Sequence, residues 1–273
     1  MESLSPDFPA GSSWLRPGVA RALEGQVIPQ LLARHRPEPG LAGDAVGARW
    51  LAGLAMADDD GLLAAAVDRL QCQGLSVETL QLDWLGPAAA ELGRLWDQDD
   101  CSFADVTVGM VRLQCCARRL GRGGPLTLVH EPGPQAPRVL LATLPGEQHG
   151  FGLTLVADAF RRAGWDVTQA AAGHNPVEAV AAQAYDLVGL SIGTSARATG
   201  VPDLCTDLRR ASRRRGLGVL LGGPLFAVPG IPVVAAPWGA DAVALDARAA
   251  VSMAAAWMTW RGGSKAVPPG GGG

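Results

Sequence analysis

The sequence predicts an α/β protein with a helical domain, in which a four-helix bundle precedes a doubly wound parallel sheet. Two periodicities predict this fold. Over residues 45–120, apolar side chains recur at spacings of three and four, as in amphipathic helices. After about residue 136, short apolar runs alternate with helical patterns, which is typical of parallel strands buried on both faces. The hydrophobic content of 48% in 273 residues excludes a chain that is disordered throughout.

The helices of the bundle are delimited by residues that start and end helices. We expect them at residues 46–56, 60–72, 76–94 and 103–120. Asp58–Asp60 offers N-caps to the second helix, Gly74 and Ser76 separate the second from the third, and Asp99–Ser102 begins the fourth. Four helices with such short connections are expected to pack antiparallel as a bundle.

The second half supplies alternating strands and helices. The strands are expected at residues 139–144, 166–169, 187–192, 218–221 and 242–244, and the helices at 151–163, 176–184, 199–214 and 247–260. The domains are then an N-terminal extension with one helix (1–43), the bundle (44–122), the sheet domain (136–262) and a flexible tail (263–273). Parallel sheets bind ligands at the carboxyl ends of their strands, so we expect the site in the loops after residues 144, 192 and 221.

Composition excludes several classes of function. A net charge of −3, from 23 Lys+Arg against 26 Asp+Glu, gives no overall attraction to nucleic acid or to an anionic membrane. No apolar run approaches about 18 residues and the start lacks the features of a signal peptide, so we expect a cytoplasmic protein without membrane contact. Five scattered cysteines without a C-x-x-C pair indicate neither a disulfide framework nor a structural zinc site.

The three loops at the strand ends share small residues and one histidine. They read Glu147-Gln-His149-Gly150-Phe-Gly152, then Ser191-Ile-Gly193-Thr194, then Gly222-Gly223. A carboxylate near an imidazole fixes its tautomer and raises its basicity, as a metal-binding histidine requires. Glycines at a strand end let the backbone come close to a ligand, although such a pair is often only a tight turn.

Together these loops resemble the cobalamin-binding Rossmann-like domain, which carries Asp-x-His-x-x-Gly, Ser-x-Leu and Gly-Gly at the same strand ends. The resemblance implies that His149 is the lower axial ligand of cobalt and that Glu147 holds the imidazole and hydrogen-bonds towards Ser191. It also implies that the nucleotide tail of the cofactor is buried beside Ser191. The residues implied to bind cofactor in these loops are Glu147, His149, Gly150, Gly152, Ser191, Gly193, Thr194, Gly222 and Gly223.

The helical half is similar to the cap that covers the upper face of the corrin in cobalamin-dependent methyltransferases and photoreceptors. The photoreceptor branch carries a Trp followed, after nine residues, by Glu-His; this chain has Trp96 followed by Val106-Thr107. The resemblance places Trp96, Val106 and Thr107 at the upper face and implies a preference for hydroxocobalamin over adenosylcobalamin. Trp84 is expected in the core of the bundle instead.

A narrower resemblance is carried by three segments, residues 92–114, 145–150 and 160–167. They are similar to the AerR/PpaA-type antirepressors of purple photosynthetic bacteria and to the related sensor domain of AppA. This resemblance implies a cobalamin-binding, light-responsive transcriptional regulator without turnover. Its partner would be a CrtJ/PpsR-type DNA-binding repressor of photosynthesis genes.

Other functions and contacts remain open from the sequence. A corrinoid methyl carrier of a methyltransferase system would share the cap and the loops, and a haem-binding redox sensor would also use His149. The run Arg209–Arg215 is expected to be a solvated helix end, so contact with DNA would be indirect, through the repressor. His35, His130 and His174 are alternative ligands that we do not favour, and the oligomeric state is left open.

Overall fold

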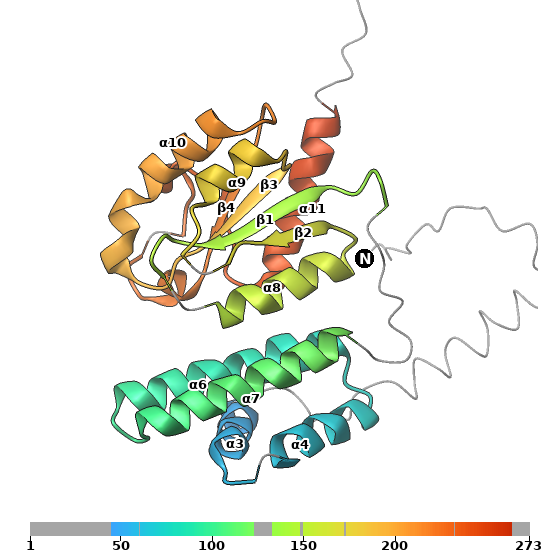
Figure 1. Cartoon of the computed structure of the whole chain (residues 1–273), viewed down its shortest axis with the longest axis vertical. Coiled ribbons are helices and arrows are strands. Elements are labelled where there is room, and N and C mark those ends of the chain that lie inside the picture. Colours follow the sequence, from blue (N-terminus) through green and yellow to red (C-terminus); the bar gives the residue numbers. More distant parts are fainter. Residues whose placement is uncertain are drawn as a thin grey trace, which may run out of the picture.

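The computed structural model describes residues 45–59, 61–122, 133–147, 150–171, 173–231 and 233–263. The expected N-terminal extension and the tail from residue 264 lie outside this range. Figure 1 shows a helical bundle beside an α/β unit with a five-stranded sheet. The predicted fold class is therefore confirmed.

The bundle is built from the four predicted helical regions. Its elements are α3 (Ala45–Met56), α4 (Gly61–Cys72), α5 (Val77–Thr79), the π-helical η2 (Leu80–Leu85), α6 (Gly86–Asp97) and α7 (Phe103–Arg122). Two predicted starts are confirmed by their capping bonds. Ser76 Oγ accepts from Thr79 N–H at 3.0 Å, and Ser102 Oγ accepts from Asp105 N–H at 3.2 Å while the Asp105 carboxylate accepts from Ser102 N–H at 2.9 Å.

The third helical region differs from the expected single α-helix. It continues to Asp97 and passes through the π-helical segment η2 before α6 begins. Pro87 has no N–H to donate within the helix, and Gly86 N–H donates to the carbonyl of Gln81, five residues earlier. The wider turn brings Gln81 to full burial, with 0% of the residue exposed.

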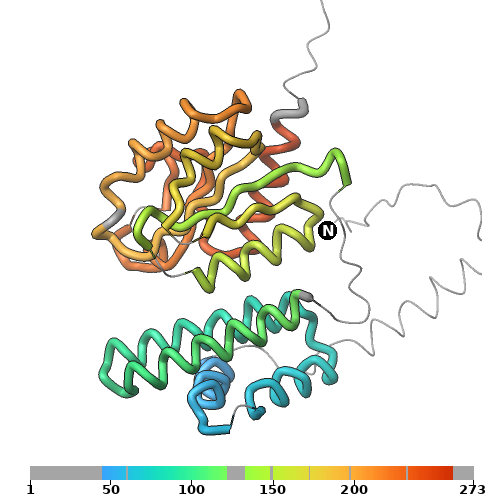
Figure 2. Tube along the Cα trace, viewed as in Figure 1, coloured from blue at the N-terminus to red at the C-terminus, as the bar shows by residue number. Residues whose placement is uncertain are grey.

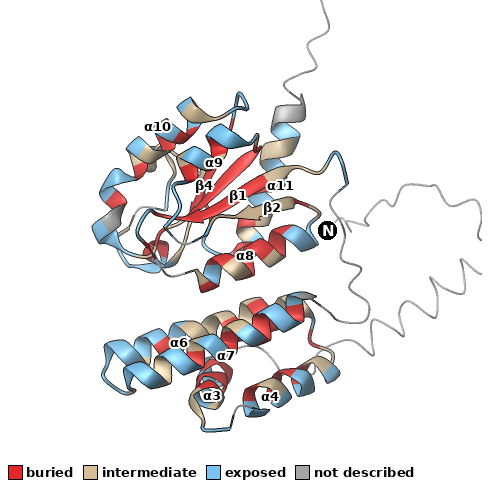
Figure 3. Cartoon of the chain, viewed as in Figure 1, coloured by how far each residue is buried: buried red, intermediate tan, exposed pale blue. Residues whose placement is uncertain are grey.

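The core of the bundle is apolar and continues onto the α/β unit. Figure 3 shows the buried positions of α3, α6 and α7. Trp84, expected in this core, is only 5% exposed. Phe151 and Leu155, which belong to the first helix of the α/β unit, pack into the same cluster. Other members include Leu51, Leu63, Leu80, Leu92 and Leu113.

The sheet contains five parallel strands in the order β2-β1-β3-β4-β5. They are β1 (Arg138–Thr143), β2 (Asp166–Gln169), β3 (Leu187–Ser191), β4 (Gly218–Gly222) and β5 (Ala242–Val243). The helices are α8 (Phe151–Arg162), α9 (Pro176–Ala182), α10 (Val201–Ala211) and α11 (Ala247–Gly263). The helix expected at 199–214 is shorter, since the 3-10 turn η3 (Ser195–Gly200) precedes it and Ser212 is its C-cap.

Helices cover both faces of the sheet because its strands are apolar on both sides. Leu140 and Val188 pack with α9 and α10, while Val139 and Leu141 pack with α8 and α11. Figure 1 shows that α8 also lies next to the bundle. The same helix therefore contacts the sheet on one side and the bundle on the other.

Two polar clusters join the bundle to the α/β unit. Gln81 donates to the Ala117 carbonyl at 3.1 Å and to Asp158 Oδ2 at 2.9 Å, and it accepts from Arg162 Nη1 at 2.6 Å. Figure 2 shows the traces of α7 and α8 running next to each other, and Gln81 bonds to both. These bonds link η2 to α7 and α8.

The second cluster is centred on Arg248, which lies on α11. Its Nη1 and Nη2 bind the two carboxylate oxygens of Asp83 at 2.8 and 2.9 Å, and its Nε binds Glu78 Oε1 at 2.7 Å. The paired donors of a guanidinium match a carboxylate in this geometry. The last helix of the chain is thereby attached to the bundle.

Candidate functional site

The carboxyl ends of β1 and β3 lie side by side where the strand order reverses. In the register of the sheet, Thr143 stands opposite Ser191, and Ser191 stands opposite Gly222. The loops after β1, β3 and β4 therefore begin next to one another. A crevice at such a switch point is the usual ligand site of an open parallel sheet.

Glu147 provides a buried carboxylate in the loop after β1, with 4% of the residue exposed. Its Oε2 accepts a hydrogen bond from Gly193 N–H at 3.0 Å, and Thr143 Oγ1 donates to its backbone carbonyl at 3.3 Å. A Cβ at position 193 would lie 1.7 Å from Glu147 Oε1, so only glycine allows this approach. The structure thus gives this carboxylate a hydrogen-bond partner in Gly193, and the bond towards Ser191 that the resemblance implies stays a prediction.

His149, the expected metal ligand, lies outside the described residues together with Gln148. The structure does place its neighbours. Glu147 precedes the gap, and Gly150 follows it as the N-cap of α8, with no side-chain capping bond. The loop thus leads from the buried carboxylate to the first turn of α8.

A cavity of about 170 Å³, here called the glycine cavity, brings together residues from all three loops. Gly223 has a φ of +106°, and a Cβ there would lie 2.6 Å from both the N and the O of Ile192. A Cβ on Gly152, by contrast, would meet nothing within 4 Å. The glycines therefore shape the turn at one wall and leave room at the other. The lining includes Gly152, Gly189, Ser191, Gly222, Gly223 and Asp246.

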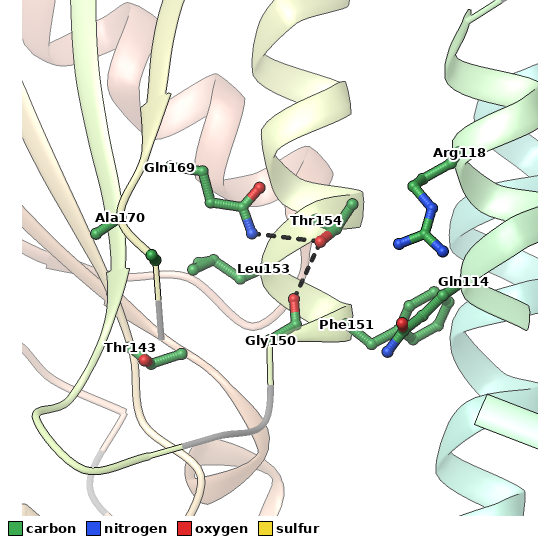
Figure 4. A pocket seen from close by; sticks show the side chains of 10 residues that line it. Gln114, Arg118, Thr143, Gly150, Phe151, Leu153, Thr154, Gln169 and Ala170 are labelled. Atoms are coloured by element: carbon green, nitrogen blue, oxygen red, sulfur yellow. Dashed lines mark hydrogen bonds between the residues drawn. The ribbon is translucent and has the colours of Figure 1, made fainter. Parts of the chain in front are cut away.

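A second cavity of about 380 Å³, here called the polar cavity, lies between α7 and the carboxyl ends of β1 and β2. Gln169 Nε2 donates to Thr154 Oγ1 at 3.3 Å, and Thr154 Oγ1 donates to the Gly150 carbonyl at 3.2 Å (Figure 4). This chain of bonds ties the end of β2 to the start of α8. The side chains that line the cavity include Gln114, Arg118, Thr143, Phe151, Thr154 and Gln169.

The sequence analysis did not select the polar side chains of this second cavity. Gln169 is the last residue of β2, so the rule that ligands bind at strand ends could have identified it. Gln114 and Arg118 are four residues apart on α7 and share a helix face. Nothing in the sequence indicates that this face, rather than another, is directed towards α8 as Figure 4 shows.

The residues expected at the upper face of the corrin do not line either cavity. Trp96 is 45% exposed and makes an edge-on contact with Phe103, with ring centroids 5.9 Å apart. Thr107 Oγ1 donates to the Phe103 carbonyl at 2.7 Å and is exposed, while Val106 is half-buried. Thr194 is exposed at the end of the loop that follows β3.

The described arginines of the run 209–215 and His174 are not among the residues that line the two cavities. Arg209 binds Asp241 at 2.8 Å, Arg213 Nε donates to the Ala181 carbonyl at 2.8 Å, and Arg214 binds Asp186 at 3.0 Å. These arginines therefore contact their own domain. His174 is exposed in the loop after β2, and His35 and His130 lie outside the described residues.

Two kinds of feature are absent from the described part of the chain. No cluster of three or more His, Cys, Asp or Glu side chains is arranged to hold a metal ion there. Among the same residues, no helix combines the length and apolar character needed to cross a membrane.

Comparison with solved structures supports the fold. The monomethylamine corrinoid protein of Methanosarcina barkeri has a TM-score of 0.60 and 16% identity, and the match covers 75% of this chain and 95% of that chain. At this level of identity the likeness concerns the fold. It includes both the helical and the α/β part, since it extends over three quarters of the chain.

Two comparisons with sequences give a relative and a matching family. An uncharacterised 20.5 kDa protein encoded in the bchF-crtJ intergenic region of Rhodobacter capsulatus is 34% identical over 101 residues, which are 37% of this chain and 51% of that protein. The aligned part of this chain thus spans about half the length of that relative. Residues 137–253, which contain the sheet and all three loops, match the family of the B12 binding domain.

Proposed function

We propose that this chain is a cobalamin-binding transcriptional regulator that responds to light and acts on a DNA-binding repressor of photosynthesis genes. The observation that carries the cobalamin part is the glycine cavity, which lies within the residues that match the B12 binding domain. The regulatory part is supported by the relative whose gene lies between bchF and crtJ. In this proposal the chain binds its ligand without turnover.

The residues at the strand ends fit the group. The glycine cavity is enclosed mainly by apolar side chains and glycines, and Gly152 leaves open space where any other residue would place a Cβ. A flat, uncharged heterocycle such as the benzimidazole of the nucleotide tail suits a cavity of this kind. We therefore assign the tail to the glycine cavity, with Ser191 and Gly223 at its end.

Glu147 has the position of a residue that orients the proposed ligand His149. Its carboxylate is buried and held by the hydrogen bond from Gly193 N–H, so it does not rotate freely towards solvent. A carboxylate two residues before a histidine would favour the tautomer whose other nitrogen faces the metal. In the proposal Glu147 thus prepares His149 to bind cobalt.

The response to light would come from a difference in affinity between two forms of the cofactor. The cobalt–carbon bond of an alkylcobalamin is cleaved by light, which leaves the hydroxo form. A protein that binds hydroxocobalamin more tightly than adenosylcobalamin would therefore load after illumination, and loading would shift its conformation or its affinity for the repressor. Val106 and Thr107, where related photoreceptors carry Glu-His, support the preference for the hydroxo form.

A titration followed by visible absorption tests the proposal. The full chain and its His149→Ala variant are mixed with hydroxocobalamin and, separately in the dark, with adenosylcobalamin. We expect a shifted spectrum with hydroxocobalamin only, and we expect its loss in the variant. Binding of neither form would overturn the cobalamin assignment, and equal binding of both would overturn the response to light.

A second measurement separates a regulator from other proteins that bind tetrapyrroles. We expect the loaded protein to weaken the binding of a CrtJ/PpsR-type repressor to its operator in a gel-shift assay, and the ligand-free protein to have no effect. Methyl transfer to a thiol acceptor, with no effect on the repressor, would support a corrinoid carrier instead. A Soret band after addition of haem, without binding of cobalamin, would support a haem sensor.

A further inference from the structure

The two cavities adjoin the same turn of α8. Leu153 lines both of them, while Gly152 lines only the glycine cavity and Gly150 only the polar cavity. One ligand with a buried tail and a broad head could therefore occupy both cavities at once. The tail assignment accounts for the glycine cavity but leaves the larger, polar cavity unexplained.

Arg118 is the cationic side chain that lines the polar cavity. Within the described part of the chain, its guanidinium makes one contact, in which Nη2 donates to Cys115 Sγ at 3.5 Å. Arg119, the next residue, binds Asp68 at 2.7 Å and is therefore used inside the bundle. Figure 4 shows the Arg118 side chain extending from α7 towards Thr154.

The opposite wall presents both donors and acceptors. Gln169 uses its NH₂ group to bond to Thr154, and within the described residues its carbonyl oxygen Oε1 accepts no hydrogen bond. Gln114 adds a second amide from the bundle. A carbonyl oxygen accepts hydrogen bonds from a guanidinium, and an amide N–H group donates to the side-chain oxygen of a glutamine. The cavity is thus equipped for primary amides, which have both kinds of group.

We infer that the face of α7 with Gln114 and Arg118 forms the second wall of the cobalamin site and, together with Gln169, binds the amide side chains on the rim of the corrin. The inference rests on the proposed function, because it names the part of that ligand which enters the polar cavity. It assigns a binding role to the bundle that does not depend on the upper axial position of cobalt. The geometry that supports it is the shared turn of α8 between the two cavities.

The experiment uses two ligands and matched variants of the full chain. Cobalamin carries the rim amides and the nucleotide tail, whereas cobinamide carries the rim amides without the tail. Arg118→Met removes the donors but keeps the aliphatic stem, and Arg118→Lys restores a positive donor. Arg119→Met is the control on the same helix. Gly152→Leu adds a large side chain to the lining of the glycine cavity at a position where a Cβ would meet nothing within 4 Å. Dissociation constants are measured by equilibrium dialysis.

We expect Arg118→Met to weaken binding of both ligands by about tenfold or more, with partial recovery in Arg118→Lys. Gly152→Leu should weaken binding of cobalamin and leave that of cobinamide unchanged. Arg119→Met should leave both affinities within about twofold of the original chain. A loss that followed cobalamin alone would place Arg118 at the tail and overturn the inference.

Two further outcomes are separable. If the original chain binds cobalamin and Arg118→Met binds it equally well, the second wall is wrong while the proposed function stands. If the original chain binds neither ligand, both fail. Thermal unfolding of the ligand-free variants excludes a general loss of structure, because a folded Arg118→Met chain with normal stability can lose affinity only through its binding site.

Discussion

At the scale of single residues, the closest fit in the site is between Gly193 and the carboxylate of Glu147. Gly193→Ala would place a Cβ 1.7 Å from Glu147 Oε1, so the carboxylate must move and lose its bond to the backbone N–H. We expect the free energy of unfolding to fall by about 1–3 kcal/mol, because a buried hydrogen bond is lost and the side chain of Glu147 is displaced. Denaturant unfolding of the ligand-free chain measures this.

The control for that change is Gly53→Ala, in the middle of α3. A Cβ there would meet nothing within 4 Å, and alanine is the better helix former. This variant should be as stable as the original chain or up to about 1 kcal/mol more stable. Equal stability of Gly193→Ala and the original chain would show that Glu147 is not held by the Gly193 backbone.

The cysteines report the burial of individual side chains. Burial raises the pKa of Cys205 to about 11, and it also raises the pKa of Cys116. At pH 8 a thiol of pKa 11 is deprotonated in only about one molecule in a thousand, and the fraction grows as the pH rises. We expect iodoacetamide to label the exposed Cys72 and Cys115 in the folded chain, and Cys116 and Cys205 only after unfolding.

Tryptic peptides separate Cys72 and Cys205, and fragmentation of the peptide that contains both Cys115 and Cys116 in tandem mass spectrometry shows which of these two is labelled. This result tests how α10 packs on the sheet, because Cys205 is 0% exposed in the cluster between α10 and the strands. Labelling of Cys205 as fast as that of Cys72 would contradict the packing of α10 described above.

At the scale of elements, the sequence predicted best what depends on local chemistry. The caps at Ser76 and Ser102 and the apolar runs of β1 and β3 are encoded by neighbouring residues, so the helix starts and the central strands could be found. The π-helical turn was not predicted, because apolar spacing alone placed one helix over residues 76–94, which includes Pro87. Pro87 follows Leu82 by five residues, and this spacing forms no sequence pattern that would predict a π-helical turn.

The candidate site also contains some residues that local sequence could predict and others that it could not. Ser191, Gly222 and Gly223 line one cavity, and they could be chosen because they lie at the carboxyl ends of strands. Arg118 could not be chosen, because its role depends on which face of α7 is directed towards α8. That orientation is set by packing between distant segments, including the bond from Gln81 to Asp158.

The turn at η2 leads to a prediction about Gln81. Its side chain is fully buried and bonds to Ala117, Asp158 and Arg162, so Gln81→Leu leaves three polar groups of α7 and α8 without this partner. We expect a loss of about 2 kcal/mol in the free energy of unfolding. Denaturant titration followed by circular dichroism measures the change.

Gln73→Leu serves as the comparison, because Gln73 is exposed at the end of α4. It should alter the free energy of unfolding by less than about 0.5 kcal/mol. If Gln81→Leu were as stable as Gln73→Leu, the buried glutamine would contribute nothing to the attachment of the bundle, and the position of α7 would have to depend on apolar packing alone.

At the scale of the whole molecule, α8 is the element that both parts share. One side of it packs on the sheet through Leu153 and Ala157, and the other packs into the bundle through Phe151 and Leu155. Both cavities adjoin its first turn. The affinity for a ligand held there would therefore depend on the position of the bundle relative to the sheet. Such a dependence would couple ligand binding to a change in conformation, as a regulator requires.

Arg248 provides the test of that coupling, because it attaches α11 to the bundle through Asp83 and Glu78. The hydrogen bonds that Arg248 donates to these carboxylates keep its pKa above the ordinary value, so it stays charged, yet all three side chains are partly exposed. Arg248→Met should thus lower the free energy of unfolding by less than about 1 kcal/mol. The affinity for cobalamin should fall severalfold, because the wall on α7 is held less firmly. Added salt should weaken binding by the original chain and have little effect on the variant. Arg210→Met, at an exposed pair on α10, should change neither. Unaltered affinity and salt dependence in Arg248→Met would show that the two parts bind the ligand independently.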